Sequence, residues 1–317
     1  MDLAVVAFGA GVGLLVGMTG IGGGSLMTPL LILVFGVKPI TAVGTDLAYG
    51  AVTKTVGGVK HLRQGTVDMT LSAWMALGSV PAAIGGVYVL EALERAHGAD
   101  FDDLLILMLA IALLLCGTAT LARAVFLKQL HGKERSTILM ERRHKIGAVL
   151  LGVFVGFVLG VTSAGSGALI AVGLILIFRL VPTRVVGTDV FHAALLLWAA
   201  AIAHLVSGNI DFALAGTILL GSVPGVWLGS HLSVRVPTDA LRTTLAIVLL
   251  GSGLGLLAKA GAGVPGFVLG AFPVAVAALI GWVTIRDRRE KQAAVQRAAA
   301  AAAEPVSAAP GRTGALR

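Results

Sequence analysis

Charged side chains are scarce in this sequence. Asp, Glu, Lys and Arg make up 13% of the 317 residues, against about 25% in an average soluble domain. Hydrophobic residues make up 57%, and the mean hydropathy is +0.95. A soluble fold of this composition would expose far more apolar surface than soluble proteins do. A helix needs about 20 apolar residues to cross a bilayer, and several runs in the sequence are that long. The composition predicts an all-α polytopic protein of the cell membrane.

Cysteine is nearly absent, because Cys116 is the only one. A single cysteine forms no intrachain disulfide and no cysteine metal cluster. The spacing of His, Asp and Glu does not indicate a metal site either. We therefore expect no metal, no cofactor and no catalytic residues, and we predict that the protein is not an enzyme.

The net charge of +8 comes from two segments. Residues 127–145 and residues 286–317 each carry a net charge of +4, which is the whole excess. Lys and Arg accumulate in the cytoplasmic loops of membrane proteins. The two segments are thus predicted to be a cytoplasmic linker and a cytoplasmic C-terminus, and nucleic acid is not an expected partner.

What the sequence does contain is a duplication. Residues 17–86 recur at 160–229 with a constant offset of 143, and 26 of these 70 positions are identical. The conserved runs include polar residues and proline, which apolar composition alone would not produce. The clearest are Val-Gly-Thr-Asp at 43–46 and 186–189, and Gly-Ser-Val-Pro at 78–81 and 221–224. A duplicated unit in an apolar chain is typical of transporters.

Eleven apolar segments are predicted to be helical, because lipid offers no partner for unpaired backbone groups. They are 3–19, 25–36, 41–60, 69–90, 102–126, 146–163, 167–180, 185–206, 212–231, 240–257 and 263–285. Glycines four residues apart at 9, 13 and 17, and at 152, 156 and 160, predict close helix packing.

Charge placement predicts how the two copies are oriented. Segments 25–36 and 167–180 are too short to span alone, so each forms a re-entrant or broken helical hairpin with its predecessor. Three transmembrane helices follow each hairpin. With both basic segments in the cytoplasm, an odd number of spans makes the two repeats inverted in topology. The predicted parts are a first repeat at 1–126, the linker at 127–145, a second repeat at 146–257, an extra C-terminal helix at 258–285 and a disordered tail at 286–317.

The hairpin breaks are the first candidate site. A helix that begins inside a membrane has free N–H groups and a partial positive charge, which favour an anion. Glycine lets an oxyanion approach the backbone, and hydroxyl groups add donors. The predicted substrate-binding residues are Thr19, Gly22, Gly23, Gly24 and Ser25 in the first copy, and Thr162, Ser163, Gly165, Ser166 and Gly167 in the second. The alternative is that the glycines only permit a tight turn.

Carboxylates inside the membrane are the second candidate, because they are costly there and usually functional. Asp46 and Asp189 lie about two turns into helices that start at a proline. They could carry a coupling cation, either a proton or Na⁺, or orient the donors of a hairpin. A structural hydrogen-bond anchor is the rival interpretation. The residues assigned to coupling or orientation are Thr45, Asp46, Lys54, Thr188, Asp189 and His192. Lys54 lies eight residues after Asp46, close to the same helical face, and could be the counter-charge for Asp46 or contact an anionic substrate. The second copy has Leu197 at that position.

The glycine-rich breaks, the repeated Val-Gly-Thr-Asp and its preceding proline together resemble the TauE/SafE family of sulfite and sulfonate exporters. The resemblance covers about residues 3–257. It implies a permease for small sulfur-containing or organic anions, and outward transport is implied by the family alone. The second copy departs from the first with Ser166 in place of a glycine and Val172 in place of Pro29.

The sequence thus predicts a secondary transporter that moves a small anion across the cell membrane by alternating access. Two alternatives stay open, an anion channel of the same fold and a non-transporting scaffold or sensor. Residues 164–167 loosely resemble a loop of intramembrane serine proteases. The duplication argues against a protease, because that mechanism does not require two copies. The expected partners are the anion, the bilayer and the coupling ion, and a homodimer is compatible with the sequence.

Overall fold

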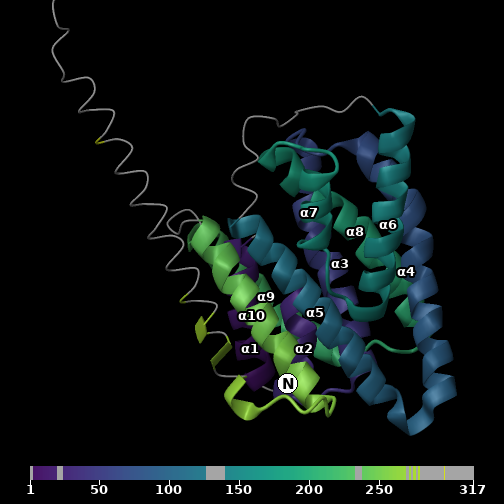
Figure 1. Cartoon of the computed structure of the whole chain (residues 1–317), viewed down its shortest axis with the longest axis vertical. Coiled ribbons are helices and arrows are strands. Elements are labelled where there is room, and N and C mark those ends of the chain that lie inside the picture. The colour runs from purple at the N-terminus through teal and green to yellow at the C-terminus, as the bar shows by residue number, and fades with distance from the viewer. Residues whose placement is uncertain are drawn as a thin grey trace, which may run out of the picture. The chain divides into compact units, whose positions relative to one another are not determined.

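The structure is a computed structural model that describes residues 3–19, 24–125, 140–232 and 238–268, with residues 271, 272, 274, 275, 278 and 296 beyond them. The regular elements in these ranges are helices (Figure 1). They are α1 (Leu3–Thr19), α2 (Gly24–Val34), α3 (Pro39–Arg63), α4 (Met69–His97), the 3₁₀ turn η1 (Gly98–Asp100), α5 (Phe101–Val125), α6 (Arg142–Thr162), α7 (Leu169–Leu176), α8 (Pro182–Val206), α9 (Phe212–Leu232) and α10 (Thr238–Lys259). All belong to one compact unit, Met1–Pro273.

Length and composition make this unit a multi-pass membrane protein. Within the described residues, four stretches are long and apolar enough to cross a bilayer: Met69–Arg123, Arg142–Thr162, Pro182–Val206 and Phe212–Gly229. Large apolar side chains such as Leu150 and Trp227, both 63% exposed, cover the outside of these helices. Of the predicted extra helix at 258–285, the structure describes residues 258–268, in which α10 ends at Lys259 and residues 266–268 are helical, and single residues up to 278. The tail at 286–317 lies outside the described residues except for residue 296.

Two helices differ most in length from the prediction. α4 continues to His97 instead of ending at 90, because Glu91 and Arg95 pair one turn apart at 3.3 Å and a helix outside the bilayer needs no apolar side chains. α7 covers only Leu169–Leu176 of the predicted 167–180. Arg179 turns the chain with a φ of 53° before α8 begins. The prediction that the second helix of each hairpin is short is confirmed by α2 and α7, with 11 and 8 residues.

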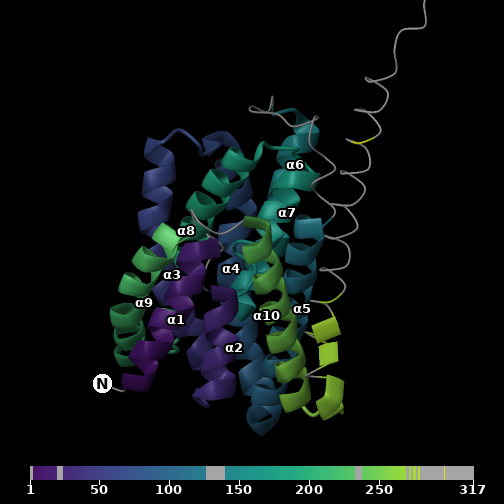
Figure 2. The ribbon, with the colours of Figure 1, turned by 90° about the vertical axis from the view of Figure 1, so that its left-hand side faces the viewer.

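The regularly spaced glycines pack each copy against the other. A Cβ atom on Gly13 in α1 would lie 2.4 Å from the carbonyl oxygen of Ser222 in α9. A Cβ atom on Gly156 in α6 would lie 2.2 Å from the carbonyl oxygen of Ser79 in α4. The second contact is the first with the two copies exchanged. The predicted close packing is confirmed, and its partner is the repeated Gly-Ser-Val-Pro segment. Figure 2 shows α1 beside α9.

The helices at the centre, α3 and α8, are equivalent in the two copies and run antiparallel. Gly50 lies against Leu197, and Gly57 lies against Val190. The indole Nε1 of Trp198 donates a 2.9 Å hydrogen bond to the hydroxyl of Thr55. Thr55 and Trp198 are equivalent residues, so a pseudo-twofold axis passes between them.

The repeated Val-Gly-Thr-Asp segment holds the turn before the fourth helix of the opposite copy. Thr188 accepts a 2.9 Å hydrogen bond from the backbone N–H of Asp68, which in turn caps α4 at Leu71. In the exchanged contact, Thr45 accepts one of 3.1 Å from the N–H of Asp211. Gly44 and Gly187 leave room for the carbonyl groups of those turns. The glycine and threonine of the segment therefore have a packing role, and its aspartate points elsewhere.

Candidate functional site at the membrane corner

The second glycine-rich break forms a buried turn between α6 and α7, here called the corner and defined as residues 163–168. α6 ends at Thr162, and Ser163 follows with a left-handed φ of 56°. Gly165 has a φ of 111°, a conformation that side chains other than glycine rarely adopt. Ser163 and Ser166 are 0% and 2% exposed. The corner thus lies inside the protein and not on its lipid-facing surface.

Asp46 of α3 joins this corner to the first copy. Its Oδ2 accepts a 2.8 Å hydrogen bond from the hydroxyl of Ser163 and a 2.6 Å one from that of Thr28 in α2. The two hydroxyl oxygens are themselves 2.7 Å apart. All three side chains are buried. One carboxylate oxygen therefore joins the hairpin of the second copy to the hairpin of the first copy.

The other predicted corner residues divide into three groups. Thr162 serves the local backbone, since it donates to the carbonyl of Val158 at 2.6 Å and accepts from the N–H of Ala164 at 3.3 Å. Gly165, Ser166 and Gly167 belong to the corner itself. In the first copy, Thr19 ends α1, Gly24 begins α2 and Ser25 is buried, while Gly22 and Gly23 lie outside the described residues.

Asp189, the equivalent of Asp46, has different surroundings. It is 5% exposed, and the charged groups that act on it are Lys54 of α3 and Arg123 of α5. Lys54 is 7% exposed, and its ammonium has no hydrogen-bond partner among the described residues. The structure thus places Lys54 in the electrostatic field of Asp189 and not at Asp46, where the sequence analysis had considered it as a counter-charge.

His192 binds hydroxyl groups of α4 and not Asp189. Its Nδ1 lies 3.3 Å from the hydroxyl of Ser72, and its Nε2 lies 3.1 Å from that of Ser79. The equivalent of His192 is Tyr49, which is buried, lies near Ser222, the equivalent of Ser79, and has no hydrogen-bond partner for its hydroxyl among the described residues. His192 therefore joins α8 to α4.

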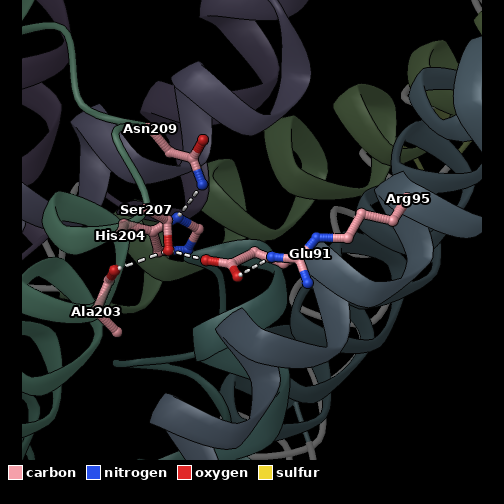
Figure 3. A network of polar contacts seen from close by, with 6 residues as sticks. All are labelled: Glu91, Arg95, Ala203, His204, Ser207 and Asn209. Atoms are coloured by element: carbon pink, nitrogen blue, oxygen red, sulfur yellow. Dashed lines mark hydrogen bonds and ion pairs between the residues drawn. The ribbon is translucent and has the colours of Figure 1, made fainter.

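A polar network links the turn after α8 to the end of α6 (Figure 3). Glu91 accepts a hydrogen bond from the hydroxyl of Ser207 and pairs with Arg95. His204 lies within 3.5 Å of the Asn209 amide, and its Nε2 lies 3.2 Å from the carbonyl oxygen of Gly160. Gly160 is three residues before the corner, so this network reaches from the surface of α4 to the second hairpin.

Two cavities lie away from the corner. One of about 540 Å³ runs along α3 and is lined by Thr55, Val56, Val59, Lys60, Arg63 and Gln64. The other, of about 320 Å³, is lined by Trp74, Arg142, Lys145, Ile146, Val149 and Leu150. Neither includes Asp46 or the corner, whose side chains are packed. Asp46, Ser163 and Ser166 are buried in this structure.

Comparison with known proteins identifies the family. A family model described as "Sulfite exporter TauE/SafE" matches residues 5–256. The chain belongs to the TauE/SafE family. Among its relatives, the "Probable membrane transporter protein YjnA" of Bacillus subtilis is 38% identical over 257 residues, which are 81% of this chain and 100% of the relative.

More distant TauE/SafE-type relatives have similar names. The "Probable membrane transporter protein YdhB" of B. subtilis is 28% identical over 77% of this chain and 96% of its own. A "Probable membrane transporter protein" of Xylella fastidiosa is 26% identical over 73% of this chain and 85% of its own. No solved structure matches the chain. Family and relatives indicate a membrane transporter and not an enzyme.

Three residues of the site were not among the candidates from sequence: Thr28, Arg123 and Tyr49. Thr28 is a polar residue inside an apolar segment, next to Pro29, and this is the signal that could have indicated it. Tyr49 stands at the position of His192 in the repeat, so the duplication itself relates the two. Arg123 lies beyond the segment where the copies align without a gap.

Proposed function

We propose that this TauE/SafE protein is a secondary carrier that moves a small oxyanion, of the sulfite or sulfonate class, across the cell membrane by alternating access. The observation that carries the proposal is the Asp46 contact. It places a buried helix break of one copy against the opposite copy, which is where a carrier of duplicated design binds its substrate. Export as the direction follows the description of the family model.

In this proposal, the anion is bound by backbone N–H groups at the two breaks when the corner opens. Ser163 gives its hydroxyl to Asp46 in the closed state, so the carboxylate orients the corner and does not itself face the anion. The backbone amides of a helix beginning can stabilise an oxyanion without a full buried counter-charge.

Inverted topology of the two copies is part of the proposal. Equivalent helices α3 and α8 contact each other antiparallel, and so do α5 and α10, where Gly117 meets Leu250 and Gly253 meets Leu114. If α3 and α8 both cross the bilayer, equivalent ends face opposite sides. The basic residues near the start of α6 favour the cytoplasm for that end, and the C-terminus is proposed to lie on the same side.

Single-cysteine labelling tests this topology. Gln64 and Ser207 are equivalent residues in the turns after α3 and α8. In a Cys116→Ala background, we expect Gln64→Cys to react with an impermeant maleimide only from the cytoplasmic side and Ser207→Cys only from outside. Cys116 is the only cysteine of the sequence, so the Cys116→Ala background has no thiol of its own. Labelling of both cysteines from the same side would contradict inverted repeats.

Blocking the corner is expected to abolish transport. The Ser166→Leu variant places a bulky apolar group where an oxyanion would approach the backbone, so we expect flux to fall at least about tenfold. The matched control is Gly85→Leu, where a Cβ atom meets nothing within 4 Å. Both variants are compared by gel filtration and then in proteoliposomes. Normal flux in a correctly folded Ser166→Leu protein would remove the corner from the mechanism, and the same test applies to Gly23→Leu.

A flux assay with the wild-type protein tests the function itself. Proteoliposomes are given sulfite, methanesulfonate or a small carboxylate, each with and without a pH or Na⁺ gradient. A carrier drives uphill accumulation of at least one anion in response to a gradient of its coupling ion. Flux that only follows the anion's own electrochemical gradient would indicate a channel, and absence of flux for every anion would favour a scaffold or sensor.

A further inference from the structure

Lys54 occupies an unusual place for a lysine. α3 has 25 residues, and Lys54 is three residues past its middle, or about 4.5 Å along the axis. It is next to Thr55, which contacts its own equivalent Trp198 on the pseudo-twofold axis. It is 93% buried, and its Nζ has no hydrogen-bond partner in the part of the chain that the structure describes. A charged group at such a depth is costly and marks an ion pathway.

The duplication shows that the lysine is not needed for packing. Its equivalent is Leu197, which is also buried and packs against Gly50. A leucine thus satisfies the same position of the fold in the other half. The ammonium group is an addition to one half only, so the path contains one such cation and not a symmetric pair.

The two buried aspartates are held in different ways. Asp46 has two hydroxyl donors on its Oδ2, from Thr28 and Ser163. The Oδ1 atoms of Asp46 and of Asp189 both lack a hydrogen-bond partner among the described residues, and no hydroxyl group of those residues donates to Asp189. What acts on Asp189 is the field of Lys54 from α3 and of Arg123 from α5. From α4, the groups that face this side of α8 are the neutral hydroxyls that bind His192.

The charges in this region balance before any substrate arrives. With both carboxylates ionised and both basic groups protonated, Asp46 and Asp189 would carry two negative charges and Lys54 and Arg123 two positive charges, and all four side chains are buried. An anion that enters adds a negative charge in a region of low dielectric, where an uncompensated charge is costly. Uptake of one proton by a carboxylate restores the balance. An anion near Lys54 would also compete with the carboxylate of Asp189 for interaction with the ammonium group of Lys54.

Resting on the proposed carrier function, we infer that Lys54 attracts the substrate anion and that Asp189 takes up the proton that accompanies it. The proton passes from hydronium on one side of the membrane to a carboxylate oxygen of Asp189, and back to water on the other side when the anion leaves. One proton moves for each monovalent anion, so transport of such an anion is electroneutral. Asp46 keeps its contacts with Thr28 and Ser163 and orients the corner.

Proton counting with methanesulfonate tests the inference. This anion does not bind a proton near neutral pH, so pH changes inside the vesicles report on the protein alone. Full-length protein is reconstituted with a trapped pH dye, and radiolabelled methanesulfonate is followed in parallel. For the wild type, we expect one proton per anion and no dependence of the flux on membrane potential.

Two variants separate the roles. For Asp189→Asn, we expect anion exchange between equal pH to persist while the accompanying proton flux falls at least about tenfold. For Lys54→Gln, we expect the half-saturating methanesulfonate concentration to rise about tenfold or more, with partial rescue by Lys54→Arg. Lys60→Gln, an exposed basic residue later in α3, is the control and should behave as wild type. Gel filtration and melting temperature confirm that each variant is folded.

The outcomes distinguish this inference from the function beneath it. Unchanged proton flux in Asp189→Asn, or unchanged half-saturation in folded Lys54→Gln, overturns the inference while leaving a carrier in place. Methanesulfonate flux through the wild type without proton movement would likewise overturn the inference while leaving a carrier in place. Absence of wild-type flux for methanesulfonate also overturns it, and absence for every anion in the earlier assay rejects the carrier itself.

Discussion

Replacing Gly156 by valine is expected to leave little folded protein. The new Cβ atom would lie 2.2 Å from the carbonyl oxygen and 2.6 Å from the Cα atom of Ser79, both of them backbone atoms of α4. No side-chain rotation relieves such a contact, so α4 and α6 must separate along their length. Overpacking of a close interface costs about 3 kcal/mol or more in such a case. A loss of the monodisperse peak and a melting temperature lowered by several degrees would be observed in detergent.

The control for Gly156 lies on α4. A Cβ atom on Gly85 meets nothing within 4 Å, so Gly85→Val should lose only a modest part of the stability, as expected for a change of helix propensity. The equivalent of Gly156 is Gly13, and Gly13→Val should be as damaging because its Cβ atom would lie 2.4 Å from the carbonyl oxygen of Ser222. Equal melting temperatures for the variants at Gly156 and Gly85 would mean that the close contact is absent in the folded protein.

Replacing Asp46 by leucine is expected to stop transport almost completely, and replacing it by asparagine is not. Leucine leaves the hydroxyls of Thr28 and Ser163 without their acceptor. Hydrogen bonds to charged groups contribute about 1.5–3 kcal/mol each. Loss of both would misplace the corner and lower the flux about a hundredfold, since about 1.4 kcal/mol corresponds to tenfold. Asparagine keeps one oxygen that can accept both hydroxyls, and its NH₂ takes the place of Oδ1.

Flux in proteoliposomes, normalised to folded protein, measures both Asp46 variants. We expect Asp46→Asn to keep at least about a tenth of the wild-type flux together with its proton coupling, because orientation and not proton transfer is the role assigned to this carboxylate. Loss of proton coupling in Asp46→Asn, with anion exchange intact, would instead make Asp46 the proton carrier. Wild-type flux in Asp46→Leu would show that the contact between the two copies is dispensable.

The sequence predicted the helices and the duplication well, for physical reasons. Long apolar runs can only be helices in lipid, and identical polar runs at a constant offset indicate a repeated unit. The glycine spacing correctly predicted close packing. It could not indicate the partner, because a glycine at every fourth residue shows only that some backbone approaches. That α1 packs on α9 and α6 on α4 had to come from the three-dimensional structure.

The candidate site was predicted less completely. The sequence picked out Asp46 and Ser163 but not their contact, since 117 residues separate them and local pattern carries no information at that distance. It assigned Thr45 and Thr188 to coupling or orientation together with the aspartates, and the structure shows that their hydroxyls accept hydrogen bonds from the turns of the opposite copy. It considered Lys54 beside Asp46 because both lie on α3, and the crossing of α3 and α8 brings Asp189 near it instead.

The exchanged glycine contacts also bear on how such a chain came about. The first helix of each copy packs against the fourth helix of the other, so neither half contains the partner that its own first helix requires. Under the proposed inverted topology, a half expressed alone would have to pair with a second molecule inserted in the opposite orientation. A single-unit ancestor of this kind would have needed two oppositely inserted chains, and fusion of the two genes would have joined them.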